Sequence, residues 1–395
     1  MTMDSETPSH WEQEEPGAAL VRSIRSLFSE DQPASGSEVA GSGDLEPDVL
    51  EVDAPPPAEA PAESPPPAES DSFRDLAERF LSASAPERAE LENRVRARGW
   101  SFEEEQDLEA LVDGVVVLAR DGDPAALELA REFTTPAAAG ALAGRIGRER
   151  DPDVRDDLCG AAARLADLMA PALAEALEEA SDRGARRVLM EALGELDGHG
   201  RAQAERMLDD PRWFVARNGA ALLARFGGEE AVAQLTGALG HDDPRVRREA
   251  VLALARIEGE DAEMLLMGML EDSDLQVRTA AVRGLGVLKA ERAVRPLLEL
   301  LEEAEDEDLL VEVIRALGAL GDPGVVPALE KRARGTLFSR SATPVRVAAY
   351  RALANVGTPH AVEVVREGRD DRNEEVRETA RSLVSADAPA GEAEE

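Results

Sequence analysis

Residues 241–270 read HDDPRVRREAVLALARIEGEDAEMLLMGML, and residues 271–289 continue with EDSDLQVRTAAVRGLGVLK. Each stretch contains Asp-x-x-Val-Arg, at Asp243–Arg247 and at Asp274–Arg278, followed by small and branched apolar residues. Each then reaches a leucine with a small residue after it, Leu254-Ala255 and Leu285-Gly286. The two stretches therefore encode the same structural unit, which we expect to be a pair of helices.

The same unit recurs along the chain at intervals of 30 to 36 residues. Its anchor is the apolar residue at the Val position, which is occupied by Val154, Ala185, Val215, Val246, Val277, Leu309, Val345 and Val376. Leucine stands eight residues after the anchor in six units, and a small residue stands nine residues after it in all eight. A fixed period of this size is typical of a solenoid, and small residues allow helices to approach closely.

The composition limits the fold class and the compartment. Of the 395 residues, only 3% are aromatic and 43% are hydrophobic, which favours stacked helices over a mixed sheet. The formal net charge of −38 should repel nucleic acid backbones. The single cysteine, Cys159, lies in an Ala-rich run, and we expect it to be buried. We find no secretory leader or membrane span and expect a reducing, cytoplasmic location.

Residues 1–71 form an acidic, Pro-rich arm with 17 carboxylates and two arginines. Such a segment buries too little apolar surface to offset chain entropy, so we expect it to be disordered. Within it, residues 18–28 place apolar side chains at helical spacing. This amphipathic segment could dock on a partner or on the protein's own groove, or it could be a chance cluster.

The rest of the chain divides into three parts. We expect a helical N-terminal cap at 72–100, a solenoid at 101–385 and a disordered acidic tail at 386–395. A helix is expected from Glu103 to Arg120. The turns carry Asp-Pro or Thr-Pro, which predicts an N-cap residue followed by proline at the first helical position. These dipeptides begin at Asp151, Asp210, Asp243 and Thr343.

An arginine directly follows the anchor in six units. These residues are Arg155, Arg186, Arg247, Arg278, Arg346 and Arg377. Because each stands near a cap aspartate, we expect a ladder of charge-assisted hydrogen bonds between adjacent units. We favour this structural role over ligand binding.

Three consecutive units carry an arginine six residues after the anchor, at Arg283, Arg315 and Arg351. If this column faces the groove formed by the second helices, it forms a basic stripe that could bind an acidic peptide, including the N-terminal arm. The alternative is that these arginines pair with nearby glutamates such as Glu312.

Two aromatic side chains are candidate partner-binding anchors. Phe338 lies in the insertion that lengthens one interval to 36 residues, and Trp213 lies in the turn after Pro211. Large aromatic residues are favoured at binding hot spots, although an aromatic near a turn can also cover the local core.

These motifs resemble the HEAT-repeat superfamily, in particular the short bacterial repeats of phycobilisome-lyase-like proteins. The resemblance rests on Asp243–Arg247 with Ala250–Ala255, on the equivalent residues of 274–286, and on Arg315–Gly321. It covers about residues 101–385 and implies an all-α solenoid, a right-handed superhelix of about eight or nine antiparallel helix pairs. Family members serve as scaffolds, adaptors and subunits, with a minority of enzymes, so the resemblance implies a fold more than an activity.

We recognise no catalytic, cofactor-binding or metal-binding motif. Deoxyhypusine hydroxylase, which is built from similar repeats, uses paired His-Glu motifs, but none of the four histidines here precedes a glutamate. We therefore predict a non-catalytic protein–protein interaction scaffold without a cofactor, with a partner of basic or mixed charge and no nucleic acid. The alternative is an accessory lyase- or chaperone-like protein that acts on a cofactor-bearing protein.

Overall fold

The computed structural model describes residues 72–257, 259–334 and 341–386. Within these ranges the chain forms twenty α-helices, four short 3-10 segments and no β-strand, which confirms the all-α prediction. The predictions for the N-terminal arm, for its segment 18–28, for Phe338 and for residues 387–395 lie outside the described residues. The described part divides into two compact units, with the boundary inside α8 after Ala172.

The first unit is organised around a cluster of phenylalanines. Its helices are α2 (Phe73–Ser82), α3 (Ala85–Glu104), α4 (Leu108–Ala119), α5 (Pro124–Phe133), α6 (Pro136–Arg148), α7 (Pro152–Arg164) and the first half of α8 (Ala166–Glu179). The Phe73 ring lies 5.2 Å from the Phe133 ring and 6.4 Å from the Phe102 ring, centroid to centroid. Phe73 also covers Gly114, where a Cβ atom would lie 1.9 Å from the ring. This cluster joins α2 to α3, α4 and α5.

The expected helix from Glu103 to Arg120 is wrong at its start. Helix α3 continues past residue 100 to Glu104, and α4 begins only at Leu108. The reason is a cap at Asp107, whose side chain accepts a hydrogen bond from the Ala110 amide.

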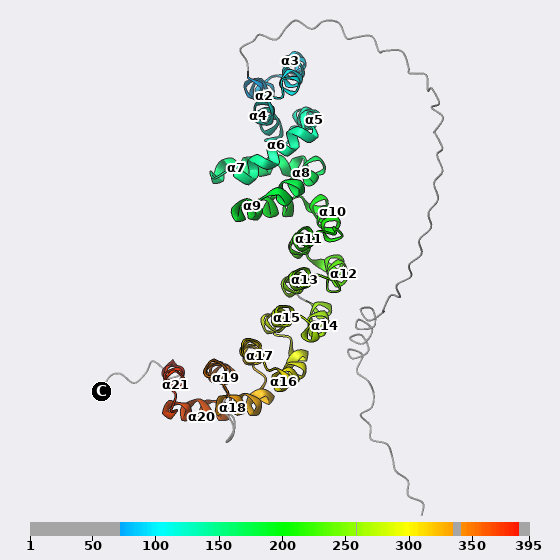
Figure 1. The fold of residues 1–395 in the computed structure, drawn as a ribbon. Helices are drawn as coiled ribbons and strands as arrows, with labels where there is room; N and C mark the ends of the chain where they lie inside the picture. Colours follow the sequence, from blue (N-terminus) through cyan, green and yellow to red (C-terminus); the bar gives the residue numbers. More distant parts are fainter. Residues whose placement is uncertain (1–71, 258, 335–340, 387–395) are drawn as a thin grey trace, which may run out of the picture. The chain divides into compact units, whose positions relative to one another are not determined.

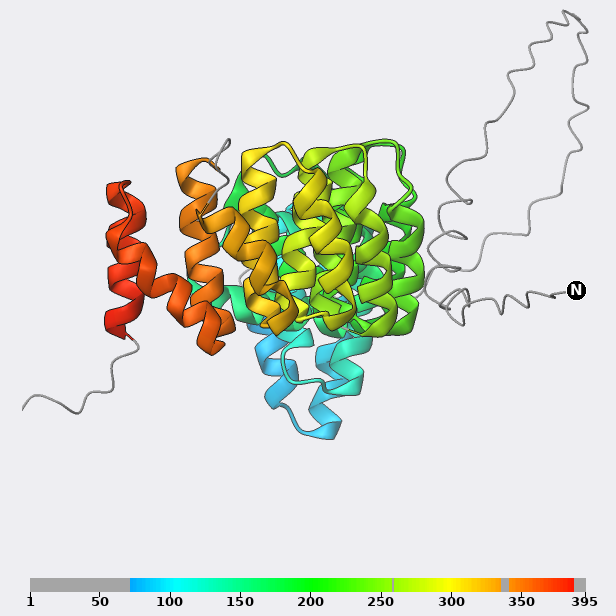
Figure 2. The ribbon, with the colours of Figure 1, turned by 90° about the horizontal axis from the view of Figure 1, so that it is seen from below.

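The second unit consists of stacked helix pairs. After α9 (Arg183–Gly194) the first helices of the pairs are α10 (Asp197–Leu208), α12 (Gly228–Ala238), α14 (Glu260–Gly268), α16 (Val294–Glu303), α18 (Val326–Arg334) and α20 (Pro359–Glu367). The second helices are α11 (Trp213–Phe226), α13 (Pro244–Ile257), α15 (Leu275–Leu288), α17 (Glu307–Leu320), α19 (Thr343–Val356) and α21 (Glu374–Ala386). Figure 1 shows the two sets as separate layers within this unit, and Figure 2 shows the same helices from below.

The leucine column forms the centre of the repeat core. Leu193, Leu223, Leu254, Leu285, Leu317 and Leu353 are all 0% exposed. The six anchors from Val215 onward are at most 2% exposed. The first two anchors differ from the others, because Val154 is 38% exposed and Ala185 is only partly buried. In α7 and α9 the buried positions begin later, at Leu158 and Val188.

The turn prediction holds at two of four sites. Asp151 caps α7 with proline at the first helical position, and α13 also begins at its proline, Pro244. It is wrong at Asp210, because that carboxylate accepts from the Arg212 amide and α11 begins only at Trp213. It is also wrong at Thr343, which already belongs to α19 and accepts a hydrogen bond from Asn373.

Consecutive second helices meet along a seam of small residues. A Cβ atom on Gly318 of α17 would lie 2.6 Å from Cβ and 2.7 Å from Cα of Ala352 in α19. A Cβ atom on Gly286 of α15 would lie 3.1 Å from Cα of Ala316 in α17. The position nine residues after one anchor therefore touches the position seven residues after the next. The sequence pattern of small residues thus sets the spacing between repeats.

We expect Gly318→Ala to destabilise the protein by about 1–3 kcal/mol, because the added methyl group would push α17 away from the backbone of α19. Gly237→Ala is the matched control. Gly237 is also helical, but nothing lies within 4 Å of its Cβ position, so alanine should stabilise by about 0.5–1 kcal/mol. Urea unfolding followed by circular dichroism measures both. A stabilising Gly318→Ala would show that the seam is not close-packed.

Candidate functional site

The arginine after the anchor connects adjacent repeats at two junctions. Nε and Nη2 of Arg247 each donate to the carboxylate of Asp272, at 2.8 Å, and the next arginine, Arg278, donates to the Asp272 carbonyl at 2.7 Å. The same arrangement joins Arg346, Asp371 and Arg377. One aspartate is thus shared by two repeats, through its side chain and its main chain.

This geometry corrects the expected ladder in two respects. The acceptor is not the cap aspartate but the residue five before the next anchor, since Asp243 pairs with Arg245 instead. The ladder is also incomplete. Arg278 has Ala304 at the acceptor position of the next unit and bonds only to its own turn. Among the described residues, the side chains of Arg155 and Arg186 form no hydrogen bond or ion pair.

The predicted basic stripe lies on exposed surface, and two of its members share one carboxylate. Arg283 Nη2 lies 3.3 Å and Arg315 Nη1 2.9 Å from Oε1 of Glu312. The pairing alternative therefore applies to these two arginines. Arg351 is exposed and forms no ion pair with any described residue.

The stripe is one edge of a larger basic surface on the second helices. The positions considered are the residue before the anchor and those two, three, six and ten residues after it. The first and the last of these are exposed in all five helices from α11 to α19, whereas the second and third are partly or fully buried. In α11, α13, α15, α17 and α19 these positions carry eight arginines and three carboxylates, Glu249, Asp308 and Glu312. We call this surface the arginine face; its arginines are Arg217, Arg225, Arg245, Arg248, Arg256, Arg283, Arg315 and Arg351.

Several cations on the arginine face have no carboxylate partner. Arg225, Arg256 and Arg351 are exposed, and none forms an ion pair with a described residue. Nε of Arg248 is buried and has no hydrogen-bond partner in the described structure. Uncompensated charge of one sign attracts the opposite sign over roughly 8–10 Å at moderate salt. The face is therefore suited to a ligand that carries carboxylates.

An aromatic cluster lies at one end of the arginine face. The Arg245 guanidinium lies 3.4 Å from the centre of the Trp213 ring, and the Arg217 guanidinium 5.7 Å from it. Phe214 packs edge-on against Trp213 at 6.0 Å and is 36% exposed. Trp213 thus begins α11 rather than lying in a turn, and it joins α11 to α13 through stacking with Arg245.

The first helices carry the opposite charge. Helices α12, α14, α16, α18 and α20 contain eleven carboxylates and five lysines or arginines. Exposed ion pairs connect residues about one repeat apart in this layer: Arg201 with Glu230, Glu260 with Arg292, and Glu302 with Lys331. Exposed pairs of this kind stabilise by at most about 1 kcal/mol each. Because carboxylates outnumber lysines and arginines in these helices, the layer stays acidic after this pairing.

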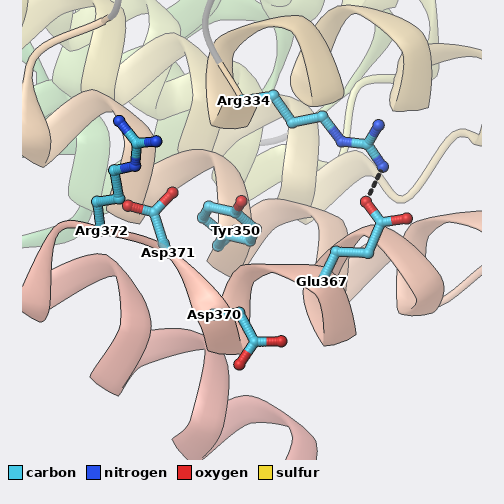
Figure 3. Close-up of a pocket in the computed structure, with 6 residues that line it drawn as sticks. All are labelled: Arg334, Tyr350, Glu367, Asp370, Asp371 and Arg372. Atoms are coloured by element: carbon cyan, nitrogen blue, oxygen red, sulfur yellow. Dashed lines mark hydrogen bonds and ion pairs between the residues drawn. The ribbon is translucent and has the colours of Figure 1, made fainter.

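A polar recess of about 300 Å³ lies near the C-terminal end of the described residues (Figure 3). It is lined by Arg334, Tyr350, Glu367, Asp370, Asp371 and Arg372. The ring of Tyr350 lies in its middle and packs on Gly368, where a Cβ atom would lie 2.6 Å from the ring. Burial raises the pKa of the Tyr350 hydroxyl, so this group stays protonated near neutral pH.

The charges around this recess are largely compensated. Arg334 pairs with Glu367, and Arg346 pairs with Asp371. The recess can form hydrogen bonds with a polar side chain, but its geometry contains no nucleophile and base held together. Sequence reasoning missed it because its residues come from α18, α19, α20 and the turn that follows.

Three further observations concern possible chemistry. In the described part of the chain, no group of three or more His, Cys, Asp or Glu side chains could hold a metal ion. No described helix combines the length and apolarity needed to cross a bilayer. Cys159 is partly exposed, which corrects its expected burial, because it lies outside the buried stripe of α7 formed by Leu158, Ala161 and Ala162.

The fold defines a helical-repeat protein, and comparison with known families gives its type. Residues 201–280 and 262–340 match the family HEAT repeats. These two stretches are therefore similar to HEAT repeats, the superfamily that the motifs resemble. A search of curated proteins finds no match.

Solved structures similar to this chain are also known. An engineered protein is 20% identical over 80% of this chain and 98% of its own, with a TM-score of 0.34. Human deoxyhypusine hydroxylase is 19% identical over 65% of this chain and 98% of its own, with a TM-score of 0.28. Kap121p bound to Nup53p is 14% identical over 79% of this chain and 40% of its own, with a TM-score of 0.47.

We expect Arg346→Ala to destabilise the protein by about 3–5 kcal/mol, because it removes the guanidinium that neutralises the carboxylate of Asp371 in a largely buried site. Arg346 is 3% exposed and also donates to the Ala333 carbonyl at 2.8 Å. Arg186→Ala removes the same repeat position without an ion pair and should change stability by less than about 0.5 kcal/mol. Chemical denaturation measures the free energy of unfolding of both variants. Equal losses in the two would contradict a role for the Arg346–Asp371 bond.

We also expect a titration effect beside Trp213. Hydrogen bonds from Arg245 lower the pKa of the Asp243 carboxyl to about 2. The stabilisation from this carboxylate is thus present above about pH 4, the range of an unperturbed aspartate, and is lost as the pH falls through about 2. Arg245→Ala should raise the pKa toward about 3.9, whereas Arg256→Ala on the same helix should leave it unchanged. Carboxyl ¹³C NMR measures the pKa of Asp243. An unchanged pKa in Arg245→Ala would show that Arg245 is not what lowers it.

Proposed function

We propose that this protein is a non-catalytic protein-interaction scaffold that binds a partner of mixed charge along its second helices. The observation that supports the proposal is the arginine face. It combines unpaired guanidinium groups with partly exposed aromatic and apolar side chains in a chain whose net charge is −38. Arginine and tryptophan are the residues most enriched at binding hot spots.

The chemistry of the face indicates how a partner would be recognised. Arg225, Arg256 and Arg351 can each receive a carboxylate without first breaking an ion pair within the described structure. Leu252 is partly exposed and Val287 is 71% exposed, so the face also offers apolar contacts between the cations. Basic residues of the same partner could meet the acidic first helices, which accounts for mixed rather than uniform charge.

Two triple variants test the proposal. Arg225, Arg256 and Arg351 are changed to Glu in the first, and Arg292, Arg295 and Arg366 in the second. The second set lies on the first-helix layer, with side chains 58%, 89% and 54% exposed, so both variants receive the same charge change on exposed positions. Circular dichroism verifies that both remain folded.

The full-length chain and both variants are immobilised and exposed to an extract of the source cells, and the retained proteins are quantified by isotope-labelled mass spectrometry. We expect a defined protein that the wild type and the first-helix variant retain and that the face variant retains at least about tenfold less. Retention should fall in 1 M salt, where the Debye length is about 3 Å. Equal retention by both variants would reject the arginine face as the binding surface.

A further inference from the structure

The N-terminal 71 residues match the arginine face in charge. They contain 17 carboxylates and only Arg22 and Arg25 as cations. The arginine face contains eight arginines and three carboxylates in a chain that elsewhere has a large acidic excess. A strongly acidic segment and a surface rich in arginine are thus parts of the same polypeptide, and their association carries no translational entropy cost of bringing two molecules together.

We propose that residues 1–71 bind in cis to the arginine face and occupy it in the absence of a partner. This inference rests on the proposed function, because it names a competitor for the same surface. The arm acts as an internal acidic pseudo-ligand, and a partner must displace it to bind.

The arm is long enough to extend along the whole arginine face. Fully extended, 71 residues span up to roughly 240 Å. Four steps between neighbouring second helices separate α11 from α19, which at an axial spacing of about 9 Å makes roughly 36 Å. An extended arm is therefore several times longer than the face. Because the arm is long, its effective concentration at the face is low, so a partner should be able to displace it.

The distribution of the arginines that form no ion pair favours an acidic segment as the ligand over a second copy of the solenoid. Arg225, Arg256 and Arg351 lie on three different helices, α11, α13 and α19, and form no ion pair with described residues. An extended chain with carboxylates distributed from Asp4 to Asp71 can follow such a row from helix to helix. Its apolar residues Leu20, Ile24 and Phe28 could contact Leu252 and Val287 between the cations.

Photo-cross-linking in the full-length chain tests this proposal. The photoreactive residue p-benzoylphenylalanine replaces Val287, which is 71% exposed and makes little contribution to the core. Irradiated protein is digested, and cross-linked peptides are identified by mass spectrometry. Equal amounts of ¹⁴N- and ¹⁵N-labelled chains are mixed beforehand, so that cross-links within one chain and between copies differ in mass.

We expect cross-links from position 287 to peptides of residues 1–71 within a single chain at low salt. Their yield should fall at least about fivefold in 1 M salt, where charges are screened beyond about 3 Å. It should fall similarly in the variant with Glu at 225, 256 and 351, and stay unchanged with Glu at 292, 295 and 366. Circular dichroism of each variant controls for folding.

Three outcomes would overturn the proposal: no cross-link to residues 1–71, mixed-isotope cross-links only, or a yield indifferent to the charge of the arginine face. Mixed-isotope cross-links would assign the face to a second copy. The test is independent of partner capture. If the arm cross-links but no extract protein depends on the face, the cis contact stands and the scaffold proposal fails; the reverse result rejects only the cis contact.

Discussion

Close contact between the small residues of consecutive second helices is the constraint on which the second unit depends. Gly318 meets Ala352 at a distance that leaves no room for an additional methyl group, and Gly286 lies in tight contact with Ala316. Each second helix therefore lies almost backbone to backbone against the next. The leucines one position before this seam are fully buried as a result, and the repeat has no stable core without its neighbour.

The same constraint separates the charges of the protein. Because small and apolar residues occupy most of the sides of each second helix that touch other helices, most charged residues other than the bridging Arg247 and Arg346 lie on its outward side, and from α11 to α19 these are mainly arginines. The first helices present mainly carboxylates. An acidic protein thus carries one basic surface, and the opposite signs lie on different layers of the repeat rather than being mixed along it.

Much of this arrangement could be predicted from the sequence, and the failures have physical causes. Leu193 to Leu353 could be placed because a leucine recurs eight residues after the anchor, one position before the small residues at which neighbouring helices meet. Val154 could not, since the burial of the anchor depends on whether the beginning of that helix is covered. Arg245, Arg248 and Arg256 stand at helical spacing, so the sequence contains enough information to place these three arginines on one side of a helix. The sharing of Glu312 by Arg283 and Arg315 depends on rotamers, and the recess around Tyr350 depends on four separate segments.

Among the described residues of the second unit, Arg–Asp–Arg connections occur at two junctions, between α13 and α15 and between α19 and α21. At the junction between α15 and α17, Ala304 stands where Asp272 and Asp371 stand in the others. The repeats are thus unequal as mechanical elements. Under load, the stack should behave as rigid blocks separated by compliant joints, and its elasticity should be set by the positions of a few aspartates.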